Sequence, residues 1–106
     1  MQNLVLSIDT SSNKHISVSL LVGEIENMNR QEIGQQKAQV VLSMIDALLK
    51  KNKKKLGDLT AIRVNSGPGS FTGLRVGVSI ANTLGFALNI PINDKPVGTL
   101  VEPVYT

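Results

Sequence analysis

The segment from residue 70 to residue 89 constrains the fold most, because it is almost uncharged and carries a small residue at every fourth position. Its one charged residue is Arg75. A glycine inside a helix costs roughly 1 kcal/mol relative to alanine, so a helix with such a row needs a compensating contact. Small side chains at this spacing form a groove that another backbone can approach closely. The row consists of Gly73, Gly77, Ala81 and Gly85.

This row has two interpretations: the helix packs tightly against its own sheet, or it also receives a helix from a partner. A second helical pattern, over residues 35–52, favours the partner. Apolar residues cover most of its circumference between residues 38 and 49, and a helix that is apolar on two sides is usually buried on two sides. The predicted partner interface comprises Ala38, Val41, Ile45, Leu48, Gly73, Leu74, Gly77, Ala81, Leu84 and Gly85.

The amino-terminal part of the chain predicts an antiparallel meander. Residues 3–9 form an apolar, β-rich run that suits a buried strand. Residues 15–22 alternate between apolar and polar side chains, and a turn at Gly23 leads into a more polar strand over residues 24–30. Three consecutive strands with short connections favour antiparallel pairing.

The remaining pattern adds parallel strands, so the expected fold class is α/β with a mixed sheet. Residues 59–64 form a strand after a helix, which predicts a crossover to a parallel neighbour. A last, edge-like strand is expected over residues 90–93, because Pro91 cannot donate to a ladder. The tail from residue 94 to residue 106 is expected to be extended.

Length and composition exclude several classes of protein. At 106 residues, the chain suits one domain and not two full lobes around a cleft. No apolar run approaches the roughly 18 residues of a membrane span, so no membrane association is expected. The chain has no cysteine, which excludes disulfides, thiol catalysis and cysteine-ligated zinc. The amino-terminal residues lack the features of a signal peptide, and we expect a cytoplasmic protein.

Basic residues are concentrated in one short run. The formal net charge is +3, but five of the eleven basic residues lie between residues 50 and 55. These cations could simply complement the dipole of a helix end, or they could steer tRNA through its phosphates. The candidate RNA-binding residues are Lys50, Lys51, Lys53, Lys54 and Lys55.

Residues 66–77 (SGPGSFTGLRVG) strongly resemble the signature of the TsaB (YeaZ) family. Residues 6–12 (LSIDTSS), 44–49 (MIDALL) and 85–91 (GFALNIP) are similar to other segments of that family, in the same order. The resemblance covers about residues 3–93. It implies a single lobe of the actin, Hsp70 and sugar-kinase (ASKHA, ribonuclease H-like) class over residues 1–93, followed by the tail. The second lobe of the family has no counterpart in this sequence.

The same resemblance implies a function in making threonylcarbamoyladenosine in tRNA. TsaB-like proteins are not the catalyst of that pathway. They pair through helices with the related transferase TsaD, and they form homodimers through the same helices. The ATPase TsaE joins them, and contact with tRNA is indirect. We therefore expect a non-catalytic scaffold subunit with no metal of its own.

An enzymatic alternative is a nucleotide-binding or nucleotide-hydrolysing site completed across a dimer. Nucleotides lie between two lobes in the ASKHA class, so we expect ATP and Mg²⁺ only in a complex with a partner. Asp9 could instead cap the turn that follows it. Arg75 is expected to have a carboxylate or phosphate partner, whereas His15, the one histidine, makes no metal site. The candidate phosphate or nucleotide residues are Asp9, Thr10, Ser11, Gly67, Gly69 and Arg75.

Overall fold

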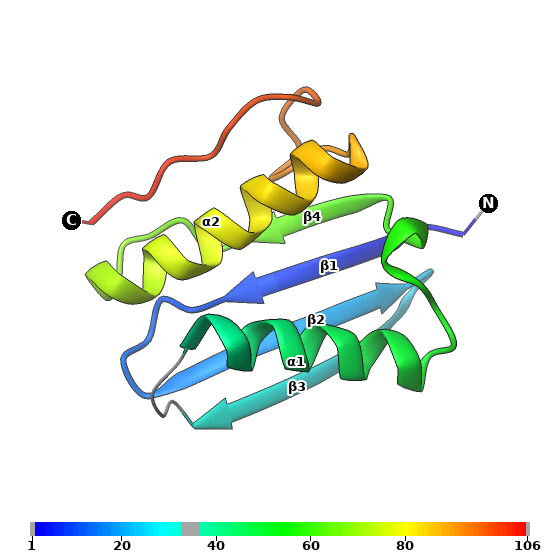
Figure 1. Ribbon diagram of the computed structural model, residues 1–106, viewed down its shortest axis with the longest axis horizontal. Helices are drawn as coiled ribbons and strands as arrows, with labels where there is room; N and C mark the ends of the chain where they lie inside the picture. The colour runs from blue at the N-terminus through cyan, green and yellow to red at the C-terminus, as the bar shows by residue number, and fades with distance from the viewer. Residues whose placement is uncertain (1, 33–36, 106) are drawn as a thin grey trace.

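The computed structural model describes residues 2–32 and 37–105, and within them it shows a helical layer packed on a four-stranded sheet (Figure 1). The elements are β1 (Leu4–Asp9), β2 (His15–Val22), β3 (Ile25–Glu32), α1 (Lys37–Lys51), the 3₁₀ helix η1 (Leu56–Asp58), β4 (Ala61–Val64) and α2 (Phe71–Leu88). The sheet order is β3-β2-β1-β4, with β1, β2 and β3 antiparallel and β4 parallel to β1. The predicted α/β class, meander and crossover are confirmed.

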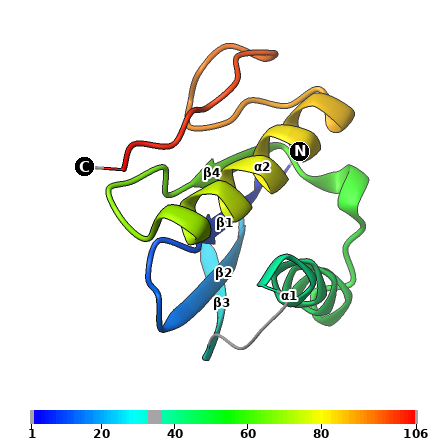
Figure 2. The same ribbon diagram turned by 60° about the vertical axis from the view of Figure 1, so that its left-hand side comes forward.

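The core lies between the sheet and both helices, because alternate strand residues point to the same face. Leu6, Val18 and Ile62 are fully buried on this face. Helix α1 packs on β2 and β3, whereas α2 packs on β4 and β1. The two helices run in the same general direction and diverge toward their carboxyl ends (Figure 1). Seen from the side, one face of the sheet is left without a helix (Figure 2).

The small residues of α2 face the sheet of the same chain, as the first of the two interpretations predicts. A Cβ atom at Gly73 would overlap the main-chain oxygen of Thr10, and one at Gly77 would overlap the Thr10 hydroxyl. A Cβ atom at Gly85 would overlap the side chain of Ile92. The row therefore lets α2 approach the end of β1 and the segment beside β4.

This packing places most of the predicted partner-interface residues inside the chain, although Ile45 also lines a hollow at the surface. Apolar periodicity shows that a helix face is buried but does not show what buries it. Only Ala38, which is exposed, and Leu84, which is half-buried, lie outside the buried class. The buried members are Val41, Ile45, Leu48, Gly73, Leu74, Gly77, Ala81 and Gly85.

The fifth strand expected over residues 90–93 is reduced to one parallel bridge between Ile62 and Ile92. The Asn93 side chain continues the pairing beyond that bridge. Its Oδ1 accepts from Val64 N at 2.8 Å, and its Nδ2 donates to Val64 O at 3.1 Å. An amide side chain thus stands in for the next peptide group of a neighbouring strand.

The tail folds back along α2 (Figures 1 and 2). Residues 94–105 contain no helix or strand, yet Val101 is buried. Val104 N donates to Ser66 O at 2.7 Å, and the rings of Phe71 and Tyr105 lie 4.4 Å apart. The tail therefore belongs to the folded unit.

Element boundaries differ slightly from those predicted. The predicted start of the first helix, at residues 35 and 36, lies outside the described residues. Strand β3 extends to Glu32, and β4 begins only at Ala61, because η1 occupies residues 56–58. Among the described helices, α2 is long and apolar enough to cross a membrane by length and composition. The prediction from composition that no segment could span a membrane was therefore too strong. The row of small residues nevertheless packs α2 against the sheet as a core helix.

Candidate functional site

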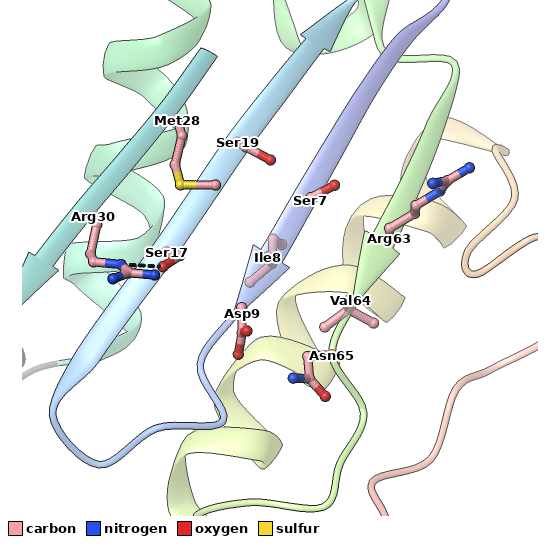
Figure 3. A pocket seen from close by; sticks show the side chains of 10 residues that line it. All are labelled: Ser7, Ile8, Asp9, Ser17, Ser19, Met28, Arg30, Arg63, Val64 and Asn65. Carbon is pink, nitrogen blue, oxygen red and sulfur yellow. Dashed lines mark hydrogen bonds between the residues drawn. The ribbon is translucent and has the colours of Figure 1, made fainter. Parts of the chain in front are cut away.

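The first candidate site lies where β1 and β4 end, with Asp9 and Asn65 close to each other (Figure 3), and Ser11 joins them through hydrogen bonds. Asp9 Oδ1 accepts from Ser11 N at 3.0 Å and from the Ser11 hydroxyl at 2.6 Å. Asn65 Nδ2 donates to Ser11 Oγ at 3.1 Å. The predicted turn cap at Asp9 is therefore present.

The pKa of Asp9 lies below its ordinary value. Partial burial raises this pKa, but the hydrogen bonds from Ser11 and Asn65 and the positive charge of Arg30 together outweigh the burial. Hydrogen bonds to the ionised form stabilise the carboxylate, so Asp9 carries a negative charge at neutral pH.

The glycine-rich loop after β4 packs on the turn after β1. A Cβ atom at Gly69 would overlap Ser11, and Ser70 N donates to Ser11 O at 2.7 Å. Gly67 N donates to Asn65 Oδ1 at 3.0 Å. Thr10, which is completely buried, donates its hydroxyl to Gly73 O. The structure thus brings Asp9, Thr10, Ser11, Gly67 and Gly69 together, but the Thr10 and Ser11 hydroxyls and the Gly67 amide already have hydrogen-bond partners within the chain.

Arg75, the last of the predicted nucleotide residues, is placed elsewhere. Its guanidinium lies 5.5 Å from the centre of the Phe71 ring, in a cation–π arrangement. The carboxylate or phosphate partner predicted for Arg75 is not among the contacts of the described residues. The aromatic ring occupies this position because the tail brings Tyr105 onto Phe71 and holds that ring beside the first turn of α2.

The uncovered face of the sheet carries a polar trough that the sequence analysis missed (Figure 3). The hollow has a volume of about 360 Å³, and Ser7, Ser17 and Ser19 line its centre. Arg30, on β3, donates from Nε to Ser17 Oγ at 3.2 Å, while Arg63 lies across the sheet on β4. The alternation of serines in β2, at Ser17 and Ser19, was the signal for this face. Within the described residues, no group of three His, Asp or Glu side chains is placed to hold a metal ion.

The second candidate site is a pair of hollows between α1 and α2, which we together call the helix groove. It is formed by Ala38, Leu42, Val76, Ile80 and Leu84. Leu42 is 50% exposed, and Val76, Ile80 and Leu84 are half-buried. A hollow of about 380 Å³ lies beside Ala38 and Ile80, and one of about 370 Å³ lies beside Leu42 and Leu84.

The lysine run surrounds the end of α1. Lys50, Lys54 and Lys55 line the second of these hollows, and Lys53 and Lys54 line another hollow with Gln2 and Asp58. Lys51, the last residue of α1, is exposed. His15, at the start of β2, is exposed.

Comparisons with known proteins agree with this architecture. The family model described as TsaD, tRNA N6-adenosine threonylcarbamoyltransferase, matches residues 28–94. The tRNA threonylcarbamoyladenosine biosynthesis protein TsaB of Haemophilus influenzae is 41% identical over 95 residues, covering 87% of this chain and 39% of that protein. TsaB of Buchnera aphidicola subsp. Schizaphis graminum is 34% identical over 92 residues, covering 87% of this chain and 43% of that protein.

A solved structure extends the likeness to the fold. YeaZ from Pseudomonas aeruginosa superimposes with a TM-score of 0.79 at 33% identity, covering 85% of this chain and 42% of that structure. The mixed sheet, with both helices on one face, is thus an ASKHA-like lobe of the TsaD-related class. Within that class, the chain belongs to the TsaB/YeaZ family. It spans about two fifths of the length of the curated relatives it matches.

Proposed function

We propose that the chain is a partner subunit in the synthesis of N6-threonylcarbamoyladenosine in tRNA, binding a TsaD-like transferase through the helix groove. Two observations support this proposal: the names of the relatives and the exposed apolar groove. The groove carries most of the weight, because exposed apolar surface between two helices is typical of a site where another helix docks. In this proposal the transferase supplies the chemistry and this chain supplies a docking surface.

Leu42→Glu provides the direct test of this docking. Leu42 lies in the groove and is half exposed, so the substitution places a charge in the interface without disturbing the core. Phe86→Glu is the matched control, since Phe86 is 81% exposed on α2 and does not line the groove. Each variant is mixed with the TsaD-like transferase of the same organism, and complex mass is measured by light scattering after gel filtration.

The expected result is a complex with the wild-type chain and with Phe86→Glu, and its loss with Leu42→Glu. Circular dichroism would verify that both variants are folded. A wild-type chain that never forms the complex, or two variants that behave alike, would contradict docking through the groove. A homodimer through the same surface would compete with the transferase. Attachment of a TsaE-like ATPase and a cytoplasmic location are further parts of the proposal.

The non-catalytic role is tested separately through Asp9, the carboxylate best placed for chemistry. Asp9→Asn should leave the contribution of this chain to tRNA modification unchanged, because its carboxylate is engaged in a turn. A loss of modification with an intact complex would favour the nucleotide alternative. Titration calorimetry with ATP and Mg²⁺ separates the two roles, because a docking subunit should release no heat without its partner.

A further inference from the structure

The end of α1 and the turn after it carry five lysines within six residues, and we call this surface the basic tip. The tip lies near the amino terminus, at the end of the molecule opposite to the carboxyl ends of β1 and β4 (Figure 1). It is therefore separate from the candidate site around Asp9. Its members are Lys50, Lys51, Lys53, Lys54 and Lys55.

The backbone at the end of α1 gathers these lysines around one turn. Lys53 adopts a left-handed conformation with φ of 56°. Lys53 N donates to Lys50 O at 3.0 Å, and Lys54 N donates to Leu49 O at 2.8 Å. This pair of bonds defines a Schellman motif, which reverses the chain against the last turn of the helix. The lysines that follow α1 therefore stay beside those that end it.

Two hollows lie on either side of this turn. Lys50, Lys54 and Lys55 line the hollow of about 370 Å³ that belongs to the helix groove. Lys53 and Lys54 line the other hollow, which has a volume of about 530 Å³. Because Lys54 lines both hollows, the basic tip is one continuous surface wrapped around the end of α1.

Carboxylates neutralise only part of the charge of the basic tip. The acidic residues that line the two hollows are Asp46 and Asp58. Asp46 pairs with Lys50 at 2.9 Å, and Asp58 Oδ2 accepts from the main-chain nitrogen of Lys55 at 2.8 Å. Five lysines against these two carboxylates leave an excess of three positive charges, which equals the formal net charge of the whole chain. A local excess of this size attracts a polyanion.

The side chains around the basic tip favour the phosphate backbone of a folded RNA among polyanions. Single-stranded nucleic acids are bound largely by stacking their bases on aromatic or arginine side chains. Among the described residues, neither an aromatic residue nor an arginine lines either hollow. Lysine instead acts as a point charge that binds phosphate oxygens without reading the bases. A double-helical stem presents two phosphate strands and therefore the denser negative charge.

We propose that the basic tip binds the phosphate backbone of a helical stem of tRNA. The inference rests on the proposed function for the choice of tRNA among folded RNAs. It adds a direct contact, whereas the family resemblance implies only an indirect one. Lys51 and Lys53 do not line the helix groove, so they remain available to RNA when a partner occupies that groove.

The test measures binding of the chain to a fluorescein-labelled tRNA transcript by fluorescence anisotropy, between about 50 and about 200 mM KCl. The tip variant carries Lys51→Gln and Lys53→Gln. The control variant carries Lys14→Gln and Lys95→Gln, which remove the same charge from exposed sites elsewhere. We expect the tip variant to bind about 10-fold more weakly at the lower salt concentration, with a log–log salt slope shallower by about 1–2. The control should change affinity less than about 2-fold.

A third variant, with Lys51→Arg and Lys53→Arg, keeps both charges and should bind tRNA as the wild type does. Equal melting temperatures of the variants would show that unfolding is not responsible for weaker binding. Any of three results would overturn the inference: no binding of tRNA to the wild-type chain, equal weakening in the tip and control variants, or binding to phosphatidylserine vesicles without binding to tRNA.

The same proteins are then mixed with the TsaD-like transferase, and complex mass is measured by light scattering. A wild-type chain that forms this complex but does not bind tRNA would overturn the inference and leave the proposed function standing. Binding of tRNA without any transferase complex would have the opposite meaning. The tip variant should form the complex as the wild type does, because its two changes lie outside the helix groove.

Discussion

Asn82, on α2, holds the main chain of Val101 through two hydrogen bonds. Its Nδ2 donates to Val101 O at 2.9 Å, and Val101 N donates to its Oδ1 at 2.9 Å. One side-chain amide thus satisfies both polar groups of a residue whose side chain is only 4% exposed. This pairing anchors the middle of the tail, while Val104 and Tyr105 attach its end.

Asn82→Ala should release the tail. The substitution removes both hydrogen bonds and leaves the Val101 main chain to water, at a cost of about 1–2 kcal/mol in the free energy of unfolding. Chymotrypsin cleavage after Leu100, which is exposed, should accelerate several-fold because the tail opens more often. Gln39→Ala, at an exposed site on α1, is the control and should leave the cleavage rate unchanged.

Gly73→Ala should destabilise the folded chain although alanine favours helices. The new Cβ atom would overlap the main-chain oxygen of Thr10, which cannot move without shifting the end of β1. We expect a loss of about 1–3 kcal/mol in urea unfolding. Gly57→Ala is the matched control, because nothing lies within 4 Å of its Cβ position. A stable Gly73→Ala protein would contradict the packing of α2 described above.

Lys53→Gly should stabilise the chain. A non-glycine residue at φ of 56° is strained, whereas glycine adopts this conformation freely. The gain should be about 0.5–1 kcal/mol, measured as a higher melting temperature. Lys51→Gly, at the last residue of α1, should have the opposite sign because glycine lowers helix propensity. Two lysine-to-glycine changes two residues apart would thus separate backbone strain from lost charge.

Asp9 should make stability depend on pH in the acid range. Its folded-state pKa lies below the unfolded value, so its contribution is complete above the unfolded pKa. As the pH falls through the folded pKa, the carboxylate is protonated and the contribution is lost. The difference in unfolding free energy between wild type and Asp9→Asn should therefore shrink on acidification. Ser11→Ala should raise the Asp9 pKa in an NMR titration, and an unchanged value would contradict the assigned cause.

Local patterns predicted most of the secondary structure. Helix α2 begins and ends where the sequence indicates, because Ser70 caps its first turn and Asn89 takes the left-handed position at its end. The three amino-terminal strands were equally clear from alternation. The turn cap at Asp9 could also be predicted, since an aspartate before three hydroxyl residues favours such a cap.

Contacts between segments distant in sequence could not be predicted from local sequence patterns. Gly77 indicated a close approach, but periodicity did not show that the approaching group was Thr10 of the same chain. The five lysines formed one cluster in sequence, and nothing in that cluster indicated the left-handed backbone at Lys53. The docking of Val101 depends on one amide side chain nineteen residues away, which leaves no periodic signal.

The Asn93 side chain has a consequence for how this sheet can grow. By occupying the Val64 peptide group, it closes off the outer edge of β4 at that point, so an incoming strand finds no free donor or acceptor there. Accidental pairing with another molecule can then occur only at the opposite edge strand, β3. That strand displays Glu26, Arg30 and Glu32 to solvent, and ionised side chains of this kind discourage fibril-like stacking.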